Sequence, residues 1–128
     1  MNWRVLFCAA AVFNWAVGLP LLLAPALMLQ VLQVAAPTDL TFHKMSGLLV
    51  LCFGFVYALV ARDPARYRPL MWVAVLGKAG VVAIFVHAWM QGLAPPRALG
   101  VALGDLAFGL AFLGFLLTHS SQQQARPQ

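Results

Sequence analysis

Four long apolar stretches separated by short polar segments dominate the sequence, at residues 3–23, 40–61, 69–91 and 97–118. Each is close to the roughly 20 residues that a helix needs to cross the hydrocarbon core of a bilayer. The pattern predicts an all-α protein, a four-transmembrane-helix bundle that occupies residues 1–118. The tail at residues 119–128 is polar and rich in glutamine, which predicts disorder.

A short interfacial helix is predicted directly after the first span, at residues 26–32. Pro20 should kink or end the first helix because its ring displaces a backbone carbonyl one turn earlier. Pro25 suits the first turn of the next helix, where leucines alternate with glutamines as in a segment lying at the membrane surface. Farther along, Gly92 is expected to end the third span.

A secretory signal peptide is the alternative interpretation of the N-terminal region. Arg4 would supply its basic segment and residues 24–26 a cleavage site between small residues. The apolar core is longer than the roughly 7–15 residues of such signals, and it contains the polar Asn14. These features favour a retained transmembrane helix.

Composition separates this chain from soluble proteins and from nucleic-acid-binding proteins. Hydrophobic residues make up 63% of the chain and charged residues 9%, too few to cover the surface of a small soluble domain. The net charge of +5 comes from basic residues gathered at the span ends, not on a face that could lie along a duplex. The two cysteines lie within apolar stretches and match no disulfide or metal pattern.

The distribution of basic residues predicts how the spans are oriented. One side would carry Arg4, Arg62, Arg66, Arg68 and Arg126, and the other Lys44 and Arg97. By the positive-inside rule both termini and the basic turn at residues 62–68 face the cytoplasm of a bacterial inner membrane. In that turn Asp63 can cap a helical turn while Arg62, Arg66 and Arg68 set topology. Alternatively, the turn grips a phospholipid head group or an acidic partner.

Lys78 and Asp105 each stand alone within a membrane-length apolar stretch. A charge at the bilayer centre costs roughly 2.5–3.5 kcal/mol, so such residues usually pair and often mark a functional site. At 1.5 Å per residue, Lys78, Asn14 and Asp105 lie about 14, 16 and 18 Å from the cytoplasmic side. His43 is expected roughly one turn above this level, and Tyr57 shares its helix face.

Small residues in three spans predict close helix packing. Gly47 and Gly54 lie on the face that carries His43 and Tyr57, where another helix or a ligand could approach the backbone. A GxxxG motif begins at Gly100 in the fourth span. Gly77 and Gly80 flank Lys78 and are expected to bring the third helix against its partner beside the charge.

Three functions remain open at this level. The first is a midplane pocket for a lipid, quinone-like or other small amphipathic ligand, lined by Lys78, Asp105, Asn14, His43 and Tyr57. The second is a proton- or ion-coupled transporter acting as a homo-oligomer, and the third is an accessory subunit of a larger membrane complex. A purely structural Lys78–Asp105 pair would also suit the pattern. No nucleophile–base set is present, so catalysis is not favoured, and no cofactor or metal site is predicted.

Several segments together resemble a known group of proteins. They are Phe53-Gly54-Phe55-Val56-Tyr57, Ala61-Arg62-Asp63-Pro64-Ala65-Arg66, Arg68-Pro69-Leu70 and Gly77-Lys78. Taken together they are similar to small four-span bacterial membrane proteins of the DoxX-like type. The resemblance covers about the middle third of the chain and implies a four-helix membrane bundle, with no activity attached.

Overall fold

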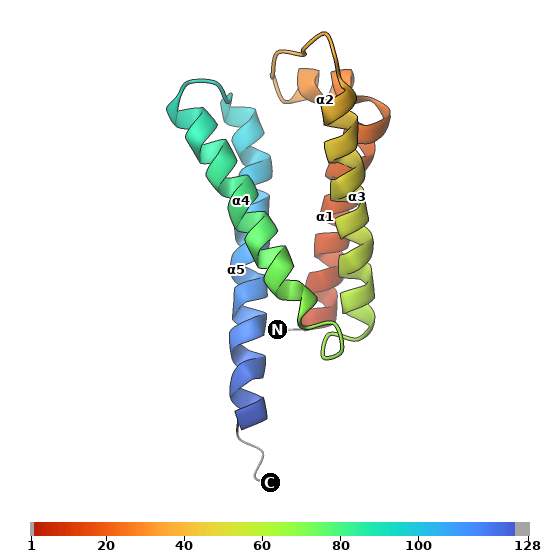
Figure 1. Cartoon of the computed structure of the whole chain (residues 1–128), viewed down its shortest axis with the longest axis vertical. Coiled ribbons are helices and arrows are strands. Elements are labelled where there is room, and N and C mark those ends of the chain that lie inside the picture. Colours follow the sequence, from red (N-terminus) through yellow and green to blue (C-terminus); the bar gives the residue numbers. More distant parts are fainter. Residues whose placement is uncertain (1, 125–128) are drawn as a thin grey trace. The chain divides into compact units, whose positions relative to one another are not determined.

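The computed structural model describes the backbone of residues 2–124 and the side chains of residues 2–118. Within that part of the chain every regular element is a helix (Figure 1). The helices are α1 (Trp3–Leu23), α2 (Pro25–Val31), α3 (Thr41–Arg62), α4 (Leu70–Met90) and α5 (Pro96–Gln124). The predicted all-α class, with four long apolar helices and a short helix after the first, is confirmed.

Pro20 does not end α1, which continues to Leu23. A proline removes one backbone donor and crowds the preceding turn. Here it lies in the last turn of the helix, where little helix remains to be disturbed. The turn still closes, because the N–H of Ala24 donates to the carbonyl of Pro20 over 2.8 Å.

The last helix is longer than the sequence pattern suggested. Its apolar, membrane-length part is Pro96–Thr118, as expected, but the helical backbone continues through Gln124. The first part of the predicted polar tail is therefore helical, and residues 125–128 lie outside the described residues. Backbone hydrogen bonds can propagate a helix into polar sequence that contains neither proline nor glycine.

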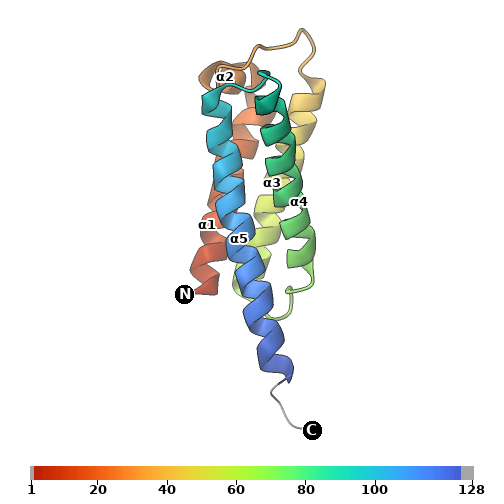
Figure 2. The same ribbon diagram turned by 90° about the vertical axis from the view of Figure 1, so that its left-hand side faces the viewer.

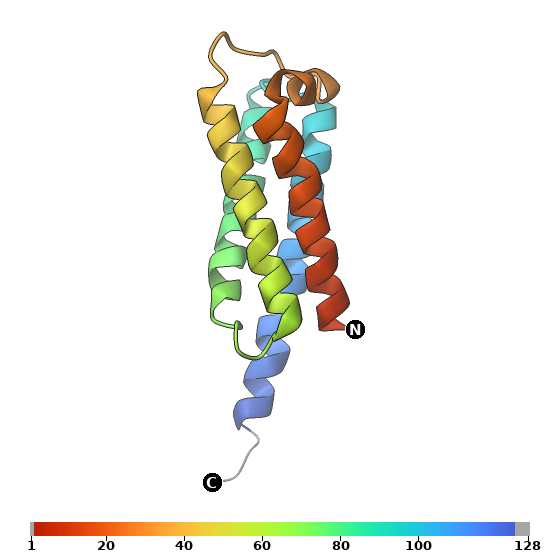
Figure 3. The same ribbon diagram turned by 90° about the vertical axis from the view of Figure 1, so that its right-hand side faces the viewer.

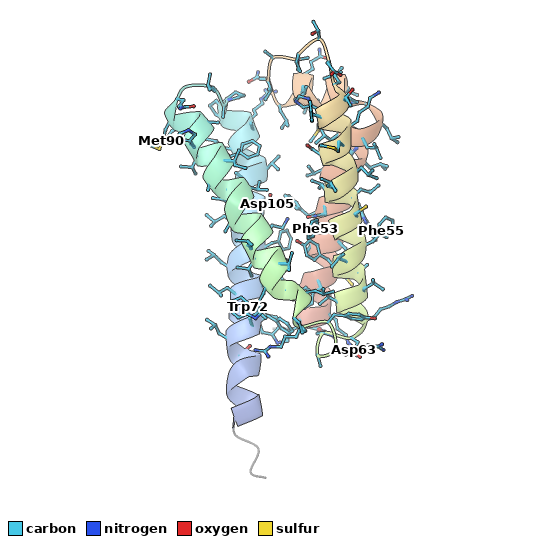
Figure 4. All side chains as sticks on the ribbon, in the orientation of Figure 1. Phe53, Phe55, Asp63, Trp72, Met90 and Asp105 are labelled. Atoms are coloured by element: carbon cyan, nitrogen blue, oxygen red, sulfur yellow. The ribbon has the colours of Figure 1, made fainter. Side chains whose placement is uncertain are left out.

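Four helices are long and apolar enough to cross a bilayer: α1, α3, α4 and the Pro96–Thr118 part of α5. Large apolar side chains are exposed along them, among them Phe55, Trp72 and Met90 (Figure 4). Water would penalise so much exposed apolar surface, whereas acyl chains solvate it. The chain is therefore a small multi-pass membrane protein.

The chain divides into two compact units, Met1–Pro64 and Ala65–Gln128. In the first, α1 and α3 run side by side in opposite directions, and α2 packs against α1 (Figure 3). Their backbones are in close contact at Gly18 and Gly47. A Cβ atom on Gly18 would lie 2.8 Å from the carbonyl oxygen of Gly47, and one on Gly47 only 2.5 Å from the nitrogen of Leu22.

The second unit is an antiparallel pair made of α4 and α5 (Figure 2). Gly92 ends α4, as predicted, with a positive φ of 72°. Its N–H donates to the carbonyl of Trp89, and the N–H of Leu93 donates to the carbonyl of Ala88, each over 2.9 Å. This is the Schellman pattern, in which a left-handed glycine supplies partners for the last helical carbonyls.

Candidate functional site

Most of the buried residues of α4 and α5 are spaced three, four or seven positions apart. On α4 they are Met71, Ala74 and Lys78, and on α5 they include Ala98, Ala102, Asp105, Phe112 and Leu116. Such spacing places a set of residues along one stripe of a helix, as in the seam of an antiparallel coiled coil. We call this stripe the α4–α5 seam. Both charged residues belong to it.

The ammonium of Lys78 donates a hydrogen bond to Oδ1 of Asp105, and the two groups form a salt bridge. The side chains are 7% and 9% exposed. Asp105 lies well inside α5, away from both ends of the helix (Figure 4). The sequence alone singled out this pair, and the structure places the two groups in direct contact.

Gly109 lies one helical turn beyond Asp105 on the same face of α5. A Cβ atom built on Gly109 would be 3.2 Å from Cβ of Lys78, a contact tighter than most real Cβ contacts. The base of the lysine side chain therefore lies against the α5 backbone. Asp105 and Gly109 together form the surface on which Lys78 rests.

Gly77 and Gly80 do not have the packing role expected of them. Neither has any atom within 4 Å of its Cβ position, and the same holds for Gly100 at the start of the GxxxG motif. The close approach beside the charge is made by a glycine of α5 instead. The reason is rotation: at 3.6 residues per turn, Gly77 lies about 100° and Gly80 about 200° around the helix from Lys78.

Arg68, which lies just before the start of α4, makes a second polar contact with α5. Nη2 of Arg68 donates to the carbonyl oxygen of Leu116 over 3.0 Å, and the arginine is half-buried. From Arg68 to Lys78 the chain advances ten residues, and from Asp105 to Leu116 it advances eleven in the opposite direction. The two contacts therefore support the same register of α4 on α5.

Asn14 belongs to the first unit and makes an interhelical hydrogen bond there. It is buried on α1, and its Nδ2 donates to the carbonyl oxygen of Val50 on α3 over 3.1 Å. Phe7, Ala11, Asn14 and Gly18 repeat at spacings of four, three and four, so Asn14 lies on a seam like that of α4 and α5. Its visible role is to join α1 to α3.

Tyr57 and His43 also lie in the first unit, on α3. Tyr57 is 2% exposed, and its ring packs against Phe53 with centroids 6.2 Å apart. His43 is half-buried near the start of α3, and its buried Nδ1 has no hydrogen-bond partner. Among the described residues no group of three or more histidine, cysteine or acidic side chains could hold a metal ion.

The residues of the basic turn differ in their exposure. Arg62, Asp63 and Arg66 are exposed, and the guanidinium of Arg66 lies over the ring of Tyr67, 5.6 Å from its centroid. Arg68 faces inward and bonds α5, as described above. Arg68, which was assigned to a surface role, thus makes an internal contact.

Two contributors to the site escaped sequence reasoning, Gly109 and the carbonyl of Leu116. Gly109 carried a usable signal, since it lies four residues after the buried aspartate and so shares its helix face. Leu116 carried none, because its side chain is an ordinary apolar one and the acceptor is a backbone atom.

Comparison with known proteins finds no family model, no curated sequence and no solved structure that matches this chain. Function must therefore be argued from the geometry of the two units themselves.

Proposed function

We propose that this small membrane protein binds a small amphipathic ligand, lipid or quinone-like, whose polar head is anchored by Lys78 and Asp105. One observation carries the proposal: a salt bridge less than a tenth exposed, on the seam of two membrane-length helices. Ionisable groups within membrane spans are costly, and by default they mark functional sites.

The first unit offers an internal comparison that supports a role beyond packing. There, a neutral amide, that of Asn14, donates a hydrogen bond from one helix to the other. A neutral hydrogen bond of this kind fixes register without charge burial. Replacing a buried ion pair by apolar residues is often neutral or stabilising, by about 1–4 kcal/mol. Packing alone therefore gives little reason to keep a lysine and an aspartate in the second unit.

The chemistry of the pair matches a polar head with an acceptor oxygen. An ammonium donates hydrogen bonds to carbonyl or phosphate oxygens, and a carboxylate accepts them from hydroxyl groups. Large apolar side chains are exposed along both α4 and α5, including Ile84 and Leu110. An acyl or isoprenoid tail would find there the same apolar surface that lipid does.

The test compares bound small molecules in folded variants. The wild-type protein and the double variant Lys78→Met/Asp105→Leu are purified in mild detergent, extracted with organic solvent and analysed by mass spectrometry. A double variant on the same helices, Leu76→Met/Leu106→Met, keeps the charges and serves as the control. We expect one amphipathic species to be retained by wild type and control at a fixed ratio and lost from the charge-free variant. Equal retention by all three would refute the proposal.

Folding of the single variants shows how far the pair also supports the structure. Lys78→Met and Asp105→Asn each leave one buried group without its partner, which typically costs about 3–5 kcal/mol. The double apolar variant removes both and should recover most of that stability. Recovery of folding without recovery of the ligand separates the anchoring role from the packing role.

Two other functions would give different outcomes in these experiments. A proton- or ion-coupled transporter, working as an oligomer, would use the titratable pair during transport. It would show pH-dependent flux in proteoliposomes that the charge-free variant lacks. An accessory subunit would show neither flux nor a bound small molecule, but a protein partner that stays attached in mild detergent.

We also propose that the protein lies in a bacterial inner membrane with both termini in the cytoplasm. Support comes from the exposed arginines of the turn between α3 and α4, against few basic residues at the opposite ends. Reporter fusions test this: a C-terminal fluorescent protein should fold and fluoresce, whereas a C-terminal alkaline phosphatase should be inactive. The reverse result would invert the topology.

A further inference from the structure

We infer that Gly109 is the positioning residue of the Lys78–Asp105 pair, because it sets how closely the lysine side chain approaches α5. This inference rests on the proposed function for its biological meaning. Its physical basis is independent, since it follows from the geometry of the α4–α5 seam.

The constraint acts at the base of the lysine, not at its flexible end. The atom nearest to a Cβ on Gly109 is Cβ of Lys78, at 3.2 Å. A lysine can reorient its four methylenes, but its Cβ moves only with the helix backbone. A methyl group at position 109 must therefore shift α4 locally, which changes the path of the lysine stem toward Asp105.

Four other glycines of α4 and α5 do not share this role. Gly77, Gly80, Gly100 and Gly114 have nothing within 4 Å of their Cβ positions. Alanine fits at each without contact. Gly114 is the best control, because it lies on the same helix five residues beyond Gly109. A general effect of alanine on α5 would appear in both Gly109→Ala and Gly114→Ala. An effect specific to the Lys78–Asp105 pair would appear in Gly109→Ala alone.

Stability cannot serve as the readout for this inference. Alanine is favoured over glycine in a helix by about 1 kcal/mol, which opposes the cost of the tight contact. These two terms are similar in size and opposite in sign, so the free energy of unfolding of Gly109→Ala does not test the contact. The geometry of the pair, by contrast, changes in one direction: Cβ of Lys78 moves away from α5, so its stem must reach farther to Asp105.

The experiment measures the reactivity of the Lys78 amine. The chain contains two lysines, Lys44 and Lys78, so a membrane-permeant N-hydroxysuccinimide ester gives two lysine adducts that mass spectrometry can assign. Lys44 is exposed and serves as the internal reference. An amine held by Asp105 on the seam is protected, because acylation requires the free, accessible base.

We expect Gly109→Ala to raise the acylation rate of Lys78 relative to Lys44 by about tenfold, equivalent to about 1.4 kcal/mol of lost protection. Gly114→Ala should leave it unchanged. Equal protection in wild type and Gly109→Ala overturns the inference, as does an equal rise in both variants. A specific rise in Gly109→Ala, with no ligand bound by the wild type, would uphold the positioning role and refute the proposed function.

Discussion

Replacing Gly47 by alanine should force α1 and α3 apart. A Cβ atom at position 47 would lie 2.5 Å from the nitrogen of Leu22, 2.8 Å from the carbonyl carbon of Leu21 and 2.9 Å from the carbonyl oxygen of Gly18. All three are backbone atoms, so no side chain can rotate away. Because ordinary contacts begin near 3.4 Å, the helices must separate by about 1 Å at this point.

Three effects determine how much Gly47→Ala changes the free energy of unfolding. Overpacking of this kind costs about 1–3 kcal/mol. A separation of 1 Å would also carry Nδ2 of Asn14 beyond hydrogen-bond range of Val50, from the present 3.1 Å. Such bonds contribute about 0.6 kcal/mol between membrane helices. Alanine gains about 1 kcal/mol of helix propensity in return. The net loss should be about 2 kcal/mol, which lowers the folding equilibrium constant roughly 30-fold.

Unfolding in mixed micelles with increasing sodium dodecyl sulfate, followed by tryptophan fluorescence, measures this loss. Trp15 is a suitable reporter, since its ring lies against Gly54 across the same interface. Gly80→Ala is the matched control, because its Cβ position is open and alanine should be neutral or stabilising there. If Gly47→Ala proved as stable as Gly80→Ala, the close α1–α3 contact would be wrong.

Three further predictions follow from single contacts. Asn14→Leu should cost only about 0.6 kcal/mol in the same unfolding assay, because it removes one interhelical hydrogen bond to Val50 and keeps the side-chain volume. Asp39 accepts a hydrogen bond from the N–H of Thr41, which lowers the pKa of Asp39 below its usual 3.8. The stabilisation that this hydrogen bond gives to the folded state is therefore complete above pH 3.8, and it is lost as the pH falls through the folded-state pKa of Asp39. The amide resonance of Thr41 should titrate there and stop titrating in Asp39→Asn. Gly92→Ala should cost about 1–2 kcal/mol, because its φ of 72° suits only glycine well, and thermal unfolding would show no shift if the left-handed stop were wrong.

The membrane class and the helix positions followed from the order of residues. A bilayer leaves no water to satisfy backbone groups, so a long apolar run has to become a helix. The sequence therefore predicted the limits of α1 and the end of α4 at Gly92. It also singled out Lys78 and Asp105, because a charge within a membrane-length apolar run is energetically costly. The continuation of α5 to Gln124 was not readable, because polar sequence is equally compatible with helix and coil.

Packing between helices decided which glycines lie in close contact and which carbonyl groups accept the side-chain hydrogen bonds. Gly47 and Gly77 look alike in sequence, yet one is pressed against a neighbouring backbone and the other is open. The difference depends on the rotation and register of each helix, which arise from contacts between distant segments. The acceptors for Asn14 and Arg68 were hidden for the same reason: every residue carries a carbonyl, and only the assembled hairpin brings one within reach.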